Sequence, residues 1–156
     1  MHLPLVCLML STAVLAAATT TTPGWPQWRG PYNTGMASGG APLEWDDNTN
    51  VQWKVEIPGR GHSTPVVAGD RLFLTTAVPT GKGTAPQGAG RAGGGADAGL
   101  EHRFEVIAID RGTGRVAWQR TATVATPHEG YHRVYGSFAS NSPVTGSSIT
   151  RNPVSR

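Results

Sequence analysis

The stretch that decides the fold is RFEVIAIDRGTGRVAWQR, residues 103–120, which reads as a β-hairpin. Residues 106–110 alternate with the two-residue period of a strand. The sequence DRGTG, which begins at Asp110, then reverses the chain, because an aspartate can accept backbone N–H bonds across a turn and glycines adopt positive φ at little cost. Residues 115–119 return as a second strand that carries Trp118. We therefore expect two antiparallel strands joined by a tight turn.

The pattern A-x-D-x-x-T-G-x-x-x-W inside this hairpin resembles the repeat signature of the pyrroloquinoline-quinone (PQQ)-like β-propellers. The resemblance implies that the Asp-to-Gly turn joins the two outer strands of a blade and that Trp118 docks between neighbouring blades. A second copy lies upstream, where Trp53 in NVQWKV matches Trp118 in RVAWQR. Two copies in one chain indicate internal repetition, and residues 51–57 are predicted to form a strand.

The phrase S-x-P-V-V-x-G-D-R-x-F-L, residues 63–74, is similar to the first two strands of a blade in the same family, with Gly69-Asp70 as the turn between them. The predicted fold class is all-β, a partial β-propeller with about one complete four-stranded antiparallel blade and pieces of two others. Ser142-Pro143-Val144, which echoes Thr64-Pro65-Val66, would open the next blade. The four strands of the complete blade are expected near residues 64–68, 71–77, 103–110 and 115–122.

Residues 1–18 are predicted to be a signal peptide, because an uncharged apolar run ends in Ala16-Ala17-Ala18, an A-x-A cleavage site. An uncleaved anchor is the alternative, although the run is short for a membrane span. Cleavage would leave a periplasmic or secreted protein with no membrane span. The one cysteine of the chain is Cys7, so the mature protein would have neither disulfides nor thiolate metal sites.

Three further regions follow from composition. Residues 19–43 are rich in Trp and Pro and include the sequence WPQWRGP. We expect this segment to pack against the edge of a blade, and a Trp-lined platform for a sugar or another ligand is the alternative. Residues 44–145 carry the PQQ-like repeats, interrupted at 79–99 by a glycine-rich insertion that is expected to be disordered because it has almost no bulky apolar side chain to bury. Residues 146–156 form a divergent tail. We interpret the chain as a partial product of a longer reading frame or a small incomplete repeat.

The segment PHEGYH contains a literal H-E-x-x-H motif formed by His128, Glu129 and His132. In a zinc metalloprotease, this spacing places two histidine ligands one helical turn apart and uses the glutamate to activate water. Gly130 and the extended pattern on both sides argue against a helix here. We predict a structural or channel-lining loop. A metal or ligand contact in a complete propeller and a zinc site are the two alternatives.

The predicted function is that of an extracytoplasmic PQQ-like repeat protein, truncated here, which acts as a non-catalytic binding or assembly scaffold. Its partners would be other proteins or an envelope component. Nucleic acid is not expected, because the chain of 156 residues has a net charge of only +3 and its basic residues are scattered. No residue is assigned as catalytic, cofactor-binding or metal-binding, and no cofactor is expected.

Two enzymatic alternatives remain at this point. The first is a fragment of a quinoprotein (PQQ-dependent) dehydrogenase, a family that holds its quinone with calcium, often beside a Cys-Cys pair, and uses an aspartate base. The mature chain has no cysteine and no recognisable set of these groups. The second, a remote one, is a zinc metalloprotease through the HExxH match.

Overall fold

The computed structural model describes residues 24–84 and 97–146, and its regular structure consists of four strands, with no helix in these two ranges. The signal segment 1–18, residues 85–96 of the glycine-rich insertion and the tail from residue 147 lie outside the described residues. No helix long and apolar enough to cross a membrane occurs in the part that the structure describes. The strands are β1 (Val66–Ala68), β2 (Arg71–Gly83), β3 (Leu100–Asp110) and β4 (Val116–Ala125).

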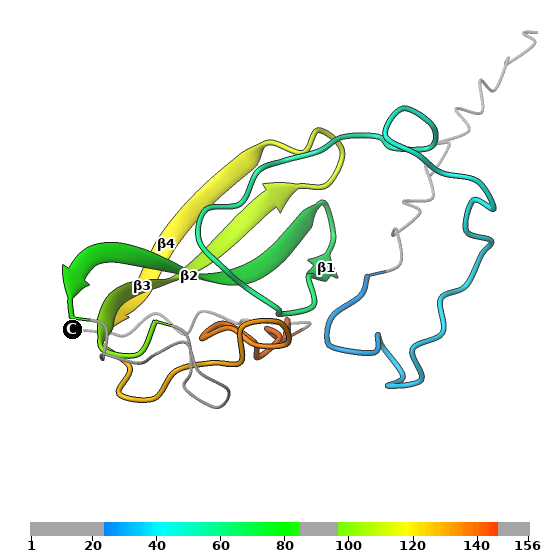
Figure 1. The fold of residues 1–156 in the computed structure, drawn as a ribbon. Helices are drawn as coiled ribbons and strands as arrows, with labels where there is room; N and C mark the ends of the chain where they lie inside the picture. Colours follow the sequence, from blue (N-terminus) through cyan, green and yellow to red (C-terminus); the bar gives the residue numbers. More distant parts are fainter. Residues whose placement is uncertain (1–23, 85–96, 147–156) are drawn as a thin grey trace, which may run out of the picture.

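The four strands form one open antiparallel sheet in the order β1-β2-β3-β4, so each strand pairs with the next one along the chain (Figure 1). This arrangement confirms the all-β prediction and the four-stranded antiparallel sheet. Ala68 pairs with Arg71 across a two-residue turn in which Gly69 has a φ of 59°. Positive φ at the first turn position is typical of the type II′ turns that join tightly connected strands.

The expected start of the glycine-rich insertion, residue 79, is wrong, because strand β2 continues to Gly83 and Pro79 is paired to His102. Strand β3 begins at Leu100, directly after the expected last residue of the insertion. A register shift separates the Pro79–His102 pair from the Gly83–Leu100 pair. Sheet hydrogen bonds use only the backbone, so a segment that lacks apolar side chains can still extend a strand when a well-anchored partner lies beside it.

The prediction of a strand at residues 51–57 is also wrong, because these residues make no ladder. The chain nevertheless keeps a two-residue period: Trp53, Val55 and Ile57 are half-buried, and the residues between them are exposed. The alternation therefore records one-sided burial against the sheet. Within the described ranges, no neighbouring strand pairs with this segment.

Both faces of the sheet are covered near its centre. Ile107 and Ile109 point to one face because they are two residues apart, and both are fully buried. On that face the Thr76 hydroxyl donates a 2.6 Å hydrogen bond to the carbonyl of Pro58. On the opposite face Phe138 packs against His102, with 4.9 Å between the ring centroids.

Strand β4 differs from its neighbours, because all of its residues are exposed. Trp118 keeps one aromatic contact, with Phe73 at 5.9 Å between ring centroids. The described part of the chain thus buries much of β3 and leaves the residues of β4 exposed. Figure 1 shows β4, in yellow, at the edge of the sheet.

The opposite edge is closed by irregular segments. Trp25 and Val67 exchange two backbone hydrogen bonds of 2.9 and 2.7 Å, and Arg60 pairs with Ala77 beyond the end of β1. Trp25 therefore packs against the sheet edge as expected for a residue of the Trp/Pro-rich segment. Trp28, the second tryptophan of that segment, remains 61% exposed.

Candidate functional site

The loop between residue 57 and β1 passes between two hollows, and Gly59 and Arg60 line both of them. Gly59 is required for this path. It has a φ of 76°, and a Cβ atom there would lie 2.3 Å from the carbonyl oxygen of Ala77. Any other residue would push the loop away from β2. Gly59 therefore allows the loop to approach β2 closely enough for Arg60 to lie at the edge of the sheet.

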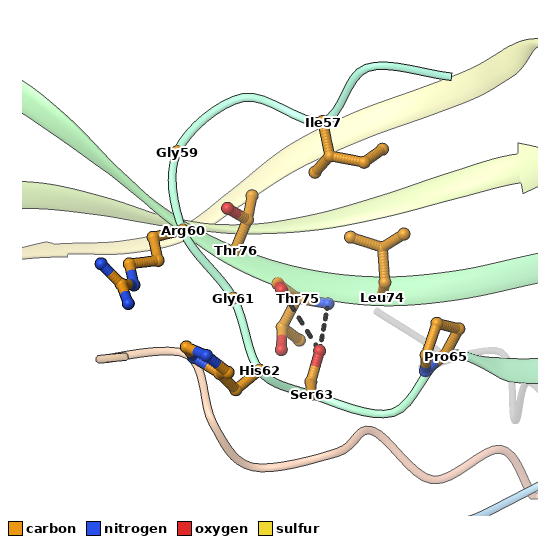
Figure 2. Close-up of a pocket in the computed structure, with 10 residues that line it drawn as sticks. All are labelled: Ile57, Gly59, Arg60, Gly61, His62, Ser63, Pro65, Leu74, Thr75 and Thr76. Carbon is orange, nitrogen blue, oxygen red and sulfur yellow. Dashed lines mark hydrogen bonds between the residues drawn. The ribbon is translucent and has the colours of Figure 1, made fainter. Parts of the chain in front are cut away.

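The first hollow has a volume of about 410 Å³ and is shown in Figure 2. The Ser63 hydroxyl accepts a hydrogen bond from the backbone N–H of Thr75 at 3.2 Å and lies 3.3 Å from its carbonyl oxygen, to which it donates. Ser63 thus replaces the missing ladder bonds between this loop and β2, a structural role. No acidic side chain lines this hollow, whose walls are Ile57, Gly59, Arg60, Gly61, His62, Ser63, Pro65, Leu74, Thr75 and Thr76.

The second hollow, about 260 Å³, contains a polar group of three side chains. The Tyr131 hydroxyl donates a 2.5 Å hydrogen bond to Asp97 Oδ2. The guanidinium of Arg60 lies over the Tyr131 ring at 5.2 Å and donates to the carbonyl of Arg133. Burial, followed by the hydrogen bond to Asp97, raises the pKa of Tyr131, so its phenol stays protonated and acts as a donor.

His102 forms the floor of the same hollow and is 2% exposed. Its Nδ1 lies 2.9 Å from the carbonyl oxygen of Leu100. Because a carbonyl can only accept, Nδ1 is the donor in this contact. The second hollow is therefore lined by a buried imidazole at His102 and by the Arg60 cation.

The HExxH residues do not converge. Residues 128–132 form an irregular loop, which confirms the prediction against a helix. The side chains of His128 and Glu129 are 94% and 87% exposed, and His128 Nε2 is 3.9 Å from the Glu129 carboxylate. His132 stacks on Tyr135, and its Nδ1 lies 3.2 Å from the backbone N of Val134 and the same distance from that of Tyr135. Among the described residues, no group of three or more His, Cys, Asp or Glu side chains is placed to hold a metal ion.

The turn of the deciding hairpin is built as the sequence predicts. Asp110 Oδ1 accepts hydrogen bonds from the backbone N–H and the hydroxyl of Thr113, both at 2.9 Å. Asp110 Oδ2 binds Arg71 at 2.6 Å. The hydrogen bonds from Thr113, and then the ion pair with Arg71, hold the pKa of Asp110 below its usual value.

No family model matches the chain, and searches of curated proteins and of solved structures find no match. The candidate site therefore rests on geometry alone. Sequence reasoning missed Arg60, Asp97, His102 and Tyr131, which lie far apart in the chain and meet only through the β2–β3 pairing and the loop after β4. The one available signal was the position of Tyr131 between two histidines that themselves stay outside the hollow.

Proposed function

We propose that the sheet is one blade of an extracytoplasmic PQQ-like β-propeller repeat protein that acts as a non-catalytic binding or assembly scaffold. The observation that carries this proposal is the docking of Trp53, from the upstream repeat, on the turn of the downstream repeat. Its indole Nε1 donates to the carbonyl of Arg111 at 2.8 Å. The repeat resemblance implies a tryptophan packed between repeats. The contact of Trp53 with the turn at Arg111 likewise joins one repeat to the next.

At the candidate site, the polar side chains are already bonded to other parts of the chain, which supports a scaffold over an enzyme. Ser63 is bound to the backbone of β2, and Tyr131 is kept protonated by burial and by Asp97. Arg60 is held over the Tyr131 ring. These contacts fix loops against the sheet, which is the arrangement that a binding surface needs.

The exposed outer strand provides the test of the blade architecture. Val124 on β4 is 50% exposed, and in a propeller it would be covered by an adjacent blade. We would label Val124→Cys with a thiol reagent in the cell envelope and, separately, in the purified chain of residues 19–156. Asn48→Cys, on an exposed turn, is the matched control. Cys7 lies in the predicted signal segment, so no other thiol of the mature chain competes.

The expected result is slow labelling of Val124→Cys in the envelope, fast labelling in the purified chain, and fast labelling of the control in both. Equal rates for Val124→Cys in the two settings would contradict the blade architecture. Amino-terminal sequencing of the envelope protein should begin near Thr19. Dye reduction that depends on added quinone and calcium would contradict the scaffold proposal and would support the alternative, a dehydrogenase.

A further inference from the structure

A third hollow, of about 620 Å³, lies on another part of the molecule from the Arg60 site. It is enclosed by the Trp/Pro-rich segment, by β1 and by the turn after β3. Its volume falls within the range of about 300–1,000 Å³ that is usual for small-molecule pockets. Its lining residues are Gly24, Trp25, Pro31, Tyr32, Thr34, Met36, Ala37, Ser38, Val67 and Arg111.

The walls of this hollow are mainly apolar and include aromatic side chains. Trp25 is fixed in place by its two backbone hydrogen bonds to Val67 of β1. Its ring also packs on Gly30, where a Cβ atom would lie 2.8 Å from the indole. Tyr32 and Met36 come from the loop that closes the other side. Tyr32 and Met36 are exposed, and aromatic and thioether groups of this kind bind flat apolar molecules well.

Arg111 supplies the single charged side chain of the lining. Its backbone is held on both sides, because its N–H donates to the carbonyl of Asp70 at 2.9 Å and its carbonyl accepts from Trp53 at 2.8 Å. Its Nη1 is buried and has no hydrogen-bond partner among residues 24–84 and 97–146. A buried guanidinium nitrogen without an acceptor is unfavourable, and such a group in a native protein calls for an explanation.

The nearby carboxylates do not supply the missing acceptor. Asp110 is engaged by Arg71 and Thr113, and Asp70 lies 3.1 Å from Arg71. Among the described residues, no acidic side chain lines the hollow. The positive charge of Arg111 therefore has no counter-charge in the lining.

We propose that this hollow is a binding site for a small aromatic carboxylate. The carboxylate would accept hydrogen bonds from the Arg111 guanidinium, whose planar fork matches carboxylate geometry, and the ring would pack between Trp25 and Tyr32. A bare inorganic anion would leave the apolar walls uncovered. A neutral aromatic molecule would leave the charge of the Arg111 guanidinium without a counter-charge. Only a ligand with both parts satisfies the residues that line the hollow.

The test compares 2-naphthoate with 2-naphthamide, which has the same ring and no charge, by ligand-observed NMR titration of the full chain. We expect the acid to bind about tenfold more tightly than the amide, the effect usual for a hydrogen bond to a charged group. Arg111→Gln should remove this preference. Arg115→Gln, on the same turn and with its charge on an exposed residue, is the matched control and should retain it.

Two further measurements keep the proposal falsifiable if Arg111→Gln does not fold. Met36→Ala, at an exposed loop position, should weaken the acid and the amide equally, because it removes only apolar contact. The ratio of acid to amide affinity in the unaltered chain is decisive by itself. Equal affinities, no binding of naphthoate at millimolar concentration, or equal losses in Arg111→Gln and Arg115→Gln would overturn the proposal. None of these outcomes depends on the labelling of β4 that tests the scaffold function.

Discussion

The indole of Trp53 and the carbonyl of Arg111 are joined by a 2.8 Å hydrogen bond across 58 residues of sequence. The same indole packs against Gly114, where an added Cβ would lie 2.6 Å from the ring. One side chain from the upstream segment is thereby fixed to both ends of the hairpin turn. Because residues 51–57 have no ladder of their own among the described residues, this contact is a main anchor of that segment on the sheet.

Replacing Trp53 with Phe keeps most of the aromatic surface and removes the donor. We expect a loss of about 1 kcal/mol in unfolding free energy, the usual net value of one hydrogen bond. Trp45→Phe is the control, since Trp45 is 82% exposed. Urea unfolding followed by far-UV circular dichroism measures both. A Trp53→Phe midpoint equal to that of the control would show that the hydrogen bond contributes nothing.

The substitution Gly114→Ala disturbs the contact between Trp53 and the hairpin turn from the side of the turn. Gly114 has a φ of 72°, so alanine would be strained there as well as colliding with the Trp53 ring. We expect a destabilisation of about 2 kcal/mol, in the middle of the range that strained backbone at one residue usually costs. Gly112→Ala is the matched substitution two residues earlier, where the nearest atom to an added Cβ is 3.6 Å away. If both variants unfold at the same urea concentration, the packing of Trp53 on the turn is not what selects glycine at position 114.

Acid should weaken the fold through Asp110. Its pKa in the folded chain is lowered by the hydrogen bonds from Thr113 and by Arg71, so its stabilising effect is complete above the unfolded pKa of about 4 and is lost as the pH falls through the folded value. Urea midpoints measured from pH 7 down to pH 2.5 should therefore fall. Asp110→Asn should reduce this slope without abolishing it, because the hydrogen bonds from Asn48 and Thr49 lower the pKa of Asp46 in the same direction. An unchanged slope in Asp110→Asn would refute the role of Asp110.

The open outer strand predicts self-association of the purified chain. All residues of β4 are exposed, and Val116, Trp118 and Val124 place apolar surface along that edge. Uncovered strand edges and apolar patches promote association, so we expect a broad, weakly cooperative melt and particle growth with concentration. Val124→Lys should slow this growth by placing a charge on the edge strand, as measured by light scattering. A monomeric chain with a sharp melt would contradict the prediction.

The HExxH segment should not bind zinc stoichiometrically. His132 Nδ1 faces the N–H groups of Val134 and Tyr135, and in the described part of the chain His128 and Glu129 belong to no group of three or more side chains placed to hold a metal ion. Elemental measurement after dialysis should give the same low zinc content for the unaltered chain and for His128→Ala. One zinc per chain that disappears in His128→Ala would establish the metal site instead.

The sequence alone determined the hairpin and its turn, because both depend on neighbours in the chain. The two-residue period of 106–110 specified a strand, and Asp110 followed by Thr113 and Gly114 specified the reversal that the structure shows. The pairing of β1 with β2 followed in the same way from Gly69-Asp70. The same kind of reasoning failed at residues 51–57, where alternation gave burial without a ladder.

Only the tertiary structure decided the sites. Arg60 and Tyr131 meet because the loop before β1 and the loop after β4 return to the same edge of the sheet, and no local pattern encodes that meeting. The length of β2 was decided in the same way, since Pro79 is held in the sheet by His102 and not by its own composition. The hollow that Arg111 lines depends on the packing of the Trp/Pro-rich segment against β1. Hydrophobic period and turn chemistry act over a few residues, whereas these contacts join segments about 20 to 90 residues apart, whose approach depends on the packing of the whole chain.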